Sequence, residues 1–517
     1  MFGSLIVFFT CYFKMEVATA VLAWAISSTC RSLSASNSLW GICPRQDIAA
    51  ELNARLSPGA EIFLPGSSGF SQATNRWSVR DAPDFNIVVV PSVENDVAEI
   101  VKYANSQDIS YLAVNGGHGA ITTVGKLQGG IQIWLDKLNS VEIADDGKTA
   151  KFGGGVLSKT ITDALWAQGK QTVSGGCECT SLLGPGLGGG HGFLQGRHGL
   201  ISDQFVSMNI VLASGDLQTI DETSDLWWAM GGAGHNFGIV TSVTSKIYDI
   251  QYPDWAYASF IFTGDKVEGL YGAINEYLLK NGTQPVDIIN YSFFFNEPSI
   301  DPKKPLIMFF ILQEGVKTVN PAYTEVFENL GPLATDGAGG SYPDLPAWTG
   351  LSNDAIPCQK PGLVYTRFPI DLQTYNIAAQ RKVYDMFASA TQQTPALNGS
   401  LFLFEGYSLQ GVKAIPSDQS AFPFRDNNLL LAPTISYMPG PPELHAAAVD
   451  LGESLRQVLH EASGREELHA YVNYALGSET EKNWYGYDEW RQARLKALKE
   501  KYDPLGKFSF YAPITLT

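Results

Sequence analysis

The sequence predicts an α+β protein with more than one domain. A strand, a helix and a second strand follow one another early in the chain, over Phe85–Val90, 93–104 and Tyr111–Val114. Hairpin patterns come next, so the stretch from 45 to 250 predicts one α+β domain with two small sheets. From about 255 to 465 the glycine density falls, and long strand-like runs alternate with candidate helices. This change predicts a second domain whose sheet covers part of the first.

Turn and cap residues mark the ends of the predicted elements in the first domain. Ser92 offers an N-cap hydroxyl just before the early helix. Asp145-Asp146-Gly147 predicts a turn between two short strands, and Ser214-Gly215 predicts the turn of another hairpin. An amphipathic helix over 158–167 is expected to end at Gly169.

Buried strands and long helices dominate the second domain and the tail. The candidate strands cover 306–312, 401–404 and 428–432, and a candidate helix covers 445–462. Near the C-terminus a basic-rich helix over 487–502 is expected to stop at Asp503-Pro504 and to be followed by a final strand.

The charge balance points to a small-molecule partner. The 517 residues carry 35 Lys and Arg against 52 Asp and Glu, a net charge of −17. Phosphate backbones need clustered cations, so a nucleic-acid partner is not expected. An anionic membrane surface would repel the chain for the same reason, and no stable membrane insertion is expected. The sequence does not set the oligomeric state.

The first 35 residues resemble a secretory signal. Two apolar runs of about ten residues flank Lys14, and each is shorter than the ~18 residues that span a bilayer. An uncleaved anchor, or an extension that is not normally translated, are the alternatives. Sequons at Asn281, Asn290 and Asn398 agree with a secreted or lumenal glycoprotein.

A glycine-rich segment occupies residues 184–199, with eight glycines in sixteen positions. Such density lets the backbone approach a flat or anionic ligand. Gly184, Gly186 and Gly189 match the dinucleotide-binding fingerprint G-x-G-x-x-G, but no buried strand precedes them, so a Rossmann fold is not expected.

Cysteine and histidine spacing allows two other interpretations. Cys177 and Cys179 with His191 and His198 can be read as a zinc site, although a C-x-C pair is tighter than most zinc motifs. Cys358 can also pair with Cys43, which the sequence does not establish.

Several motifs follow one another in a fixed order along the chain. Asn115-Gly-Gly-His-Gly119 follows the strand–helix–strand unit, and Cys177 lies 59 residues after His118. Leu187-Gly-Gly-Gly190, Phe237-Gly-Ile-Val240 and Tyr471-Val-Asn-Tyr474 come next. Together these motifs resemble the FAD-linked oxidases of the vanillyl-alcohol oxidase superfamily, specifically the berberine-bridge-enzyme-like group. The resemblance covers about residues 43–517, and fungal secondary-metabolite oxidases are the most similar in style.

The resemblance implies three parts. Residues 43–250 would form a PCMH-type FAD-binding domain of two subdomains, 251–465 a substrate domain with an antiparallel sheet covered by helices, and 466–517 a segment that returns to the FAD domain. His118 would carry the flavin covalently, and Cys177 would be a second attachment point, with Cys179 an alternative. The implied cofactor-binding residues are Asn115, Gly116, Gly117, His118, Gly119, Cys177, Gly184, Gly188, Gly189, Gly190, Gly238, Ile239, Val240 and Asn473.

The implied reaction is hydride removal from a substrate C–H to flavin N5, assisted by a base, with O₂ as the expected acceptor. Counting back from Phe422-Pro-Phe-Arg425, the glutamate base of the plant enzymes is replaced by Ala414. Related carbohydrate oxidases use a tyrosine of the Tyr-x-Asn-Tyr motif as the base, so the resemblance implies Tyr474 as the base here, with Tyr471 beside it and Glu405 as an acidic helper. Such a tyrosine needs a depressed pKa to act at neutral pH. The alternative is that both tyrosines only pack against the flavin.

Three functions remain open at this point. The first is an oxidase of a small secondary-metabolite alcohol, amine or activated ring carbon, with oxidative cyclisation as one outcome. The second is a secreted carbohydrate oxidase, whose groove should be rich in Trp and Tyr. The third is a flavin-fold binding protein without turnover, which the missing plant glutamate motivates.

Overall fold

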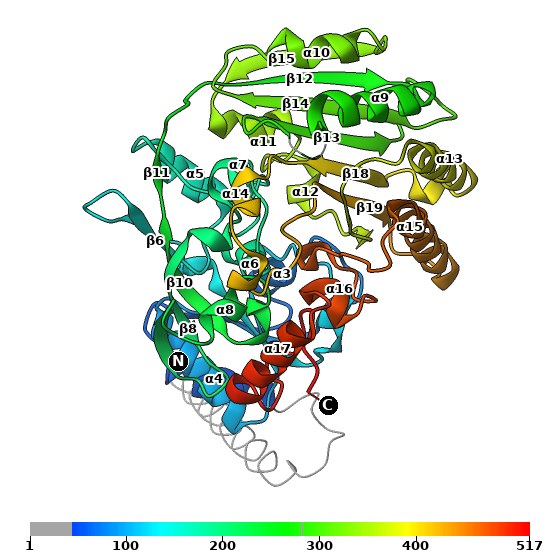
Figure 1. Cartoon of the computed structure of the whole chain (residues 1–517). Coiled ribbons are helices and arrows are strands. Elements are labelled where there is room, and N and C mark those ends of the chain that lie inside the picture. Colours follow the sequence, from blue (N-terminus) through cyan, green and yellow to red (C-terminus); the bar gives the residue numbers. More distant parts are fainter. Residues whose placement is uncertain (1–43, 281, 283, 517) are drawn as a thin grey trace, which may run out of the picture.

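The computed structural model describes residues 44–280, 282 and 284–516. The expected signal segment, Cys43 and the sequon asparagine Asn281 lie outside the described residues. Two lobes are visible in Figure 1: a lower one built from the first half of the chain with the C-terminal helices, and an upper one built around a large sheet. The site lies where the two lobes meet.

The first sheet of the lower lobe has the order β1-β2-β4-β3. Its strands are Glu61–Phe63, Phe85–Val90, Gly130–Trp134 and Tyr111–Val114, for β1, β2, β4 and β3. β2, β4 and β3 run parallel, because helix α4 (Glu94–Ser106) crosses over between β2 and β3. The helix buries Val97, Ile100 and Val101 completely, as its helical spacing predicts.

The start of α4 differs from the predicted cap. The N-cap residue is Val93, and the hydroxyl of Ser92 does not cap the helix. The carboxylate of Asp96 in the first turn instead accepts the backbone N–H groups of Ser92 and Val93 at 2.9 and 3.1 Å. A carboxylate in the first turn is also stabilised by the positive end of the helix dipole, and here it fixes the chain as it enters the helix.

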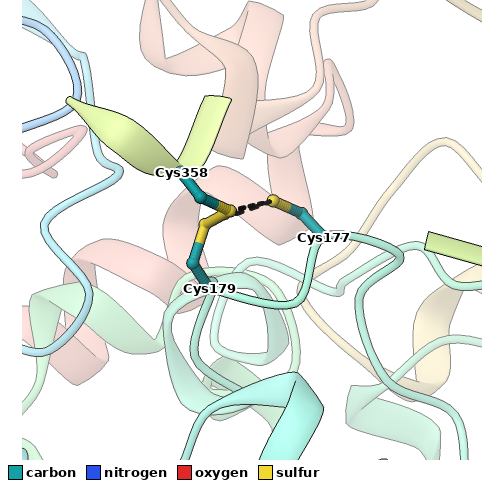
Figure 2. Close-up of side chains that lie close together, drawn as sticks. All are labelled: Cys177, Cys179 and Cys358. Carbon is teal, nitrogen blue, oxygen red and sulfur yellow. Dashed lines mark hydrogen bonds between the residues drawn. A yellow bond between two sulfur atoms is a disulfide. The ribbon is translucent and has the colours of Figure 1, made fainter. Parts of the chain in front are cut away.

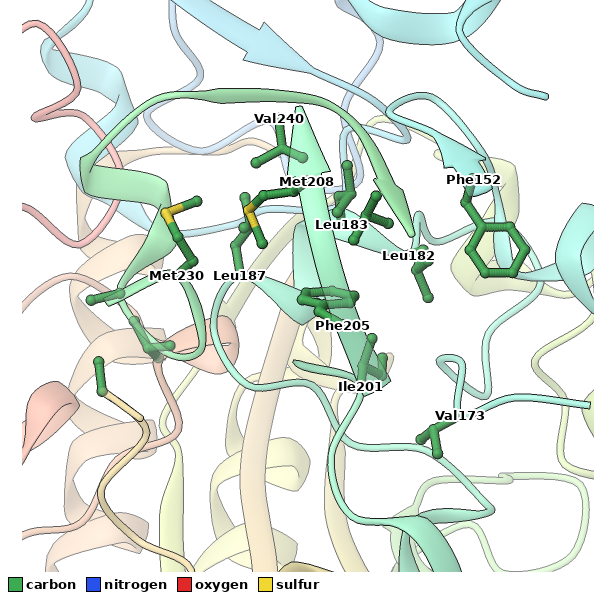
Figure 3. Close-up of a cluster of buried hydrophobic side chains, with 14 of the residues drawn as sticks. Phe152, Val173, Leu182, Leu183, Leu187, Ile201, Phe205, Met208, Met230 and Val240 are labelled. Carbon is green, nitrogen blue, oxygen red and sulfur yellow. The ribbon is translucent and has the colours of Figure 1, made fainter. Parts of the chain in front are cut away.

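The second sheet of the lower lobe has the order β5-β6-β10-β8-β9. Its strands are Val141–Ile143, Thr149–Gly153, Ile239–Lys246, Phe205–Val211 and Leu217–Asp221, in that order. Both predicted hairpins are confirmed, and their glycines, Gly147 and Gly215, adopt the positive φ that these turns require. Helix α5 (Ser158–Trp166) precedes Gly169 as expected. Buried side chains around β8 and β10, including Phe152, Phe205 and Met208, form the core in Figure 3.

The upper lobe holds one antiparallel sheet of order β15-β12-β14-β13-β18-β19-β16, with β17 paired to β19. Its strands are β12 Trp255–Phe262, β13 Ile288–Phe295, β14 Leu306–Glu314, β15 Ala334–Gly340, β16 Val364–Arg367, β17 Ile370–Leu372, β18 Leu401–Gly406 and β19 Leu429–Tyr437. Helices α9 (Val267–Ala273), α13 (Ile377–Gln393) and α15 (Pro442–Ser463) cover one face (Figure 1). The predicted strands and the predicted long helix are confirmed.

Strand alternation separates the two faces of this sheet. Along β18, Phe402 and Phe404 are fully buried in the core beneath the helices. Leu401, Leu403 and Glu405 point to the opposite face, where they line a cavity above the lower lobe. The two-residue period therefore delivers a carboxylate to the cavity from an otherwise apolar strand.

The C-terminal segment packs against the lower lobe. Helices α16 (Glu481–Tyr485) and α17 (Glu489–Tyr502) contribute Trp484 and Leu495 to the same buried cluster as Phe152. The predicted final strand is wrong: residues 503–516 contain no strand. The side chains of Asp503 and Asn236 accept backbone N–H groups of this tail, which replaces strand pairing.

Short helices fill the connections. These are α2 Pro44–Asn53, α3 Ser68–Thr74, α6 Leu183–Gly186, α7 Gln195–His198, α8 Trp227–Met230, α10 Pro321–Glu328, α11 Leu345–Trp348, α12 Ile356–Gln359 and α14 Gln410–Lys413. In the described residues, no helix is both long enough and apolar enough to cross a bilayer.

Candidate active site

A cavity of about 820 Å³ lies between the lower lobe and the open face of the upper sheet. This volume is in the upper range for cofactor and small-molecule sites. Most of the residues singled out from the sequence line it. They are Asn115, Gly116, Gly117, His118, Gly119, Cys177, Gly184, Gly238, Ile239, Val240, Glu405, Tyr471, Asn473 and Tyr474.

The glycine turn after β3 forms one wall of this cavity. Gly117 has a φ of +66°, which favours glycine. A Cβ on Gly116 would lie 2.7 Å from the carbonyl oxygen of Cys179, so a side chain does not fit there. The amide of Asn115 donates to the Gly154 carbonyl at 2.8 Å and fixes the start of the turn. The turn is thus held with its backbone against the cavity.

His118 leaves this turn as a neutral imidazole. Burial, followed by the nearby charges of Lys360, Arg367 and Arg76, lowers its pKa from 6.5 to about 3. Its Nε2 atom lies 3.2 Å from the Sγ atom of Cys179. A neutral ring keeps a lone pair on one nitrogen, which is the form that adds to an electrophilic carbon.

The triple glycine does not line the cavity. A Cβ on Gly188 would lie 2.3 Å from the side-chain oxygen of Asn473, and one on Gly189 would lie 2.5 Å from Phe422. A Cβ on Gly190 would lie 2.8 Å from the side chain of Ile201. Direct contact of these three glycines with the cofactor stays a prediction. They let the glycine segment approach the C-terminal motif, which carries Asn473 to the cavity.

The cysteines pair differently from both sequence interpretations. Cys179 and Cys358 form a disulfide between the loop before α6 and helix α12, whereas Cys177 is a free thiol (Figure 2). Cys358 is therefore not the partner of Cys43. Burial raises the pKa of the Cys177 thiol from 9 to about 11. The backbone carbonyl of Cys177 accepts a hydrogen bond from the hydroxyl of Thr180, which also lines the cavity.

The two histidines of the zinc interpretation do not lie with the cysteines. Among the described residues, the sulfur group contains Cys177, Cys179 and Cys358, and neither His191 nor His198 belongs to it. His198 instead stacks on Tyr248, with ring centroids 3.7 Å apart. His191 lines the cavity and bonds to Gln195 at 2.9 Å through its Nδ1 atom.

Glu405 and Tyr474 form an acid–tyrosine pair across the cavity from the glycine turn. The Tyr474 hydroxyl donates to the two carboxylate oxygens of Glu405 at 3.2 and 3.4 Å. Burial raises the Glu405 pKa from 4.5 to about 8, against the opposing effects of the Tyr474 hydrogen bond and of Arg367. Burial and the nearby Glu405 also raise the Tyr474 pKa well above 10. The protein groups around Tyr474 therefore do not supply the lower pKa that a tyrosine base would need at neutral pH.

Tyr471 orders the floor of the site. Its hydroxyl accepts the Asn473 amide at 2.7 Å and the His191 backbone N–H at 3.3 Å. Burial raises its pKa, so it stays protonated at neutral pH. Ala414, which the sequence placed at the plant base position, is exposed beyond the end of α14. Glu405 is the carboxylate that lines the cavity instead.

Three cations near His118 were not found from the sequence. Arg76 donates to the Gly119 carbonyl at 2.8 Å, and its buried Nη1 atom has no partner among the described residues. The guanidinium of Arg367 lies 4.4 Å from the centroid of the Tyr474 ring. Lys360 donates to the Asn75 carbonyl at 3.1 Å. Each is an isolated basic residue in the sequence, so no motif marks it.

The remaining sequons differ in accessibility. Asn290 lies in β13 with a side chain that is 1% exposed, and its amide donates to Gln284 at 2.7 Å. A glycan does not fit at this buried position, so the predicted glycosylation of Asn290 conflicts with the structure. Asn398 is partly exposed in the turn before β18.

Sequence comparison places the chain among known proteins. Residues 85–221 match the family model of an FAD binding domain. The chain is 54% identical over 501 residues to the FAD-linked oxidoreductase chyH of Penicillium rubens, covering 97% of this chain and 100% of the relative. The chain belongs to the FAD-linked oxidoreductase family. It is also 51% identical over 493 residues to the FAD-linked oxidoreductase chry5 of Gibberella zeae, covering 93% and 97% of the two chains.

Solved structures share the fold of this FAD-linked oxidoreductase. The berberine-bridge-enzyme-like protein 1 of Physcomitrella patens has a TM-score of 0.75 at 19% identity, over 92% of this chain and 100% of the other. Glucooligosaccharide oxidase from Acremonium strictum, which carries a 6-S-cysteinyl, 8α-N1-histidyl FAD, has a TM-score of 0.73 at 18% identity, over 90% and 98%. The expected α+β, berberine-bridge-enzyme-like fold is confirmed.

The residues present fit an FAD molecule. The cavity has the required size, Gly116, Gly117 and Gly119 have no side chains to block a close backbone approach, and Arg76 offers an unpaired buried donor suited to an anion. The neutral imidazole of His118 faces the same space.

Proposed function

We propose that this FAD-linked oxidoreductase is an oxidase that removes a hydride from a small secondary-metabolite alcohol, amine or activated ring carbon, with O₂ as the acceptor. The observation that carries the proposal is the Glu405–Tyr474 pair, which faces the glycine turn and His118 across one cavity. When bound, FAD supplies the electron acceptor for the hydride. Oxidative cyclisation of the product is one outcome of such chemistry.

The cofactor would be held by the glycine turn, the start of β10 and the C-terminal motif. His118 would carry the covalent bond, because its imidazole is neutral. Cys177 is the free thiol of the C-x-C pair and lines the cavity, so it is the proposed second attachment point. The glucooligosaccharide oxidase carries both types of bond, which supports the same pairing here.

Glu405 is the better proton acceptor of the acid–tyrosine pair. A carboxyl with a pKa near 8 is partly ionised at neutral pH, whereas a tyrosine with a pKa well above 10 is not. Tyr474 donates to Glu405 and so holds the carboxylate in one orientation. We therefore assign the base to Glu405 and a positioning role to Tyr474 and Tyr471, reversing the order expected from the sequence.

The cavity wall favours an apolar or aromatic substrate. Phe293, Leu401, Leu403 and Tyr407 line it on the substrate-sheet side. The carbohydrate-oxidase alternative is supported by the fold of the glucooligosaccharide oxidase and by six tyrosines in the lining, although only one tryptophan, Trp77, lines the cavity among the described residues. A binding protein without turnover would have no use for a buried ionisable carboxyl, which costs stability.

The segment boundaries and the compartment belong to the same proposal. Residues 43–250 with 466–517 would form the FAD-binding part, and 251–465 the substrate part. Secretion, with removal of residues 1–35, would deliver the protein to an oxidising compartment. The Cys179–Cys358 disulfide supports that location.

The first test is acid precipitation of the purified protein followed by absorbance scans of pellet and supernatant. We expect flavin in the pellet for the wild type, for Cys177→Ser, which His118 still holds, and for His118→Ala, which Cys177 still holds. Only the His118→Ala/Cys177→Ser double variant should release it to the supernatant, and circular dichroism and size-exclusion profiles check that each variant is folded. Release of the flavin from Cys177→Ser would contradict the role of His118, and release from His118→Ala would contradict that of Cys177. Substrate screening with an H₂O₂ readout then tests the oxidase, and no H₂O₂ from any flavin-reducing substrate would contradict it.

A further inference from the structure

Three cysteines place their sulfur atoms together at the edge of the cavity. The sulfurs of Cys177, Cys179 and Cys358 lie within 4.8 Å of one another. The free Cys177 sulfur is 3.4 Å from that of Cys179 and 3.6 Å from that of Cys358 (Figure 2). A free thiol is therefore in contact with both halves of a disulfide, which is the proximity that thiol–disulfide exchange needs.

We propose that these residues form an intramolecular exchange centre in which the Cys177 thiolate attacks the Cys358 sulfur. A Cys177–Cys358 bond forms and the Cys179–Cys358 bond breaks. The proton of Cys177 leaves to water before the attack, and the electron pair of the broken bond stays on Cys179, which then takes a proton from water. One disulfide and one thiol are present before and after, so no oxidant or reductant is needed.

Cys358 is the expected target of the attack because a new Cys177–Cys358 bond still closes the long loop that the existing bridge closes. The existing bridge joins positions 179 residues apart. Attack on Cys358 keeps the loop before α6 tied to helix α12, and so keeps most of the entropic benefit of closing that long loop. Attack on Cys179 would instead close a small ring within Cys177-Glu178-Cys179 and release α12. The nearly equal sulfur distances place Cys177 beside the bond, so a cysteine side chain must rotate before in-line attack.

Exchange would move the free thiol toward His118. In the structure the free sulfur belongs to Cys177, whereas the bonded Cys179 sulfur lies 3.2 Å from His118 Nε2. After exchange, Cys179 carries the thiol at this position. If the proposed flavin function holds, the two disulfide isomers present different sulfurs to the same cofactor, and the C-x-C pair becomes a choice between two attachment points.

The surroundings of Cys177 make the exchange depend on pH. Burial, and to a smaller extent the charge of Glu178, disfavours the thiolate. Lys159 Nζ lies 3.3 Å from a carboxylate oxygen of Glu178, and His118 Nε2 lies 3.2 Å from the Cys179 sulfur, with the charge of Lys360 acting on His118. With a pKa of about 11, the thiolate fraction rises about tenfold for each pH unit between 7 and 10.

Disulfide mapping of the full-length protein, purified without reductant, tests the proposal. Samples held at pH 7 and pH 9 are quenched with N-ethylmaleimide at mildly acidic pH, digested without reduction and analysed by mass spectrometry. We expect a Cys177–Cys358 peptide with alkylated Cys179 to appear roughly 100-fold faster at pH 9 than at pH 7. The proposal would be overturned if prolonged incubation at pH 9 yielded the Cys179–Cys358 peptide alone, or if it yielded a Cys177–Cys179 bridge.

Two variants sharpen this test. Cys179→Ser should join Cys177 to Cys358 in air, whereas Cys177→Ser should keep the Cys179–Cys358 bridge at every pH. Free Cys177 and Cys358 in the folded Cys179→Ser variant would overturn the exchange, and the wild-type mapping decides alone if that variant does not fold. Exchange in protein that holds its flavin through His118 alone would support both proposals, whereas exchange in protein that binds no flavin would support this inference and contradict the proposed function. Flavin bonded to Cys177 in every wild-type molecule would overturn this inference and leave the proposed function standing.

Discussion

The buried carboxyl of Glu405 should make the protein less stable as the pH rises. Its side chain is 5% exposed, and its pKa is raised from 4.5 to about 8. Between these values the unfolded chain releases the proton while the folded chain keeps it, so folding takes up a proton and stability falls with increasing pH. The Glu405 contribution is complete below pH 4.5 and is lost as the pH rises to about 8.

The magnitude follows from the same two values. A shift from 4.5 to about 8 corresponds to at most about 5 kcal/mol at 1.36 kcal/mol per pKa unit, and relaxation around the ionised group reduces this to roughly half. Glu405→Gln cannot ionise, and its amide oxygen can still accept the Tyr474 hydroxyl. We therefore expect the variant to match the wild type near pH 4.5 and to exceed it by ~2–3 kcal/mol at pH 8.5.

Thermal unfolding at several pH values measures this difference. At about 2–4 °C per kcal/mol for a domain of this size, the melting temperature of Glu405→Gln should exceed that of the wild type by several degrees at pH 8.5. Glu443→Gln, at an exposed position of α15, is the matched control and should show no such trend. A Glu405→Gln variant whose advantage is absent at pH 8.5, or is equal at all pH values, would refute the assigned burial and pKa.

Two further changes test the base and the cofactor cradle. Tyr474→Phe removes a hydrogen bond that lowers the Glu405 pKa, so the rising limb of the pH–rate profile should move above pH 8, whereas Glu405→Gln should lower turnover about 100-fold or more. Steady-state H₂O₂ assays with a substrate found by screening measure both, and a larger loss of turnover in Tyr474→Phe than in Glu405→Gln would return the base to Tyr474. Gly116→Ala should reduce flavin content and cost about 1–3 kcal/mol, because its Cβ would meet the Cys179 carbonyl at 2.7 Å. Gly272→Ala in α9, where no atom lies within 4 Å of the new Cβ, is its control, and equal flavin absorbance in the two proteins would show that the turn tolerates a side chain.

Local pattern was enough to predict much of the fold. The β2–α4–β3 unit, the two hairpins, β14, β18 and α15 follow from runs of apolar residues and turn glycines that lie within a few positions of one another. The same holds for His118, because glycines on both sides mark a tight turn at a strand end. The family resemblance then added the cofactor and the order of the segments. These features are local because strand, helix and turn preferences depend on neighbouring residues.

Only the tertiary structure determined how distant groups act on one another. Cys179 pairs with a residue 179 positions away, and Glu405 meets Tyr474 from a different part of the chain. Burial decided the direction of each pKa, raising that of Tyr474 where the sequence argument required a lower one. Burial also placed Asn290 beyond the reach of a glycan. A sequence states which side chains are present, but solvent exclusion and the charges that face each group arise only when remote segments pack together.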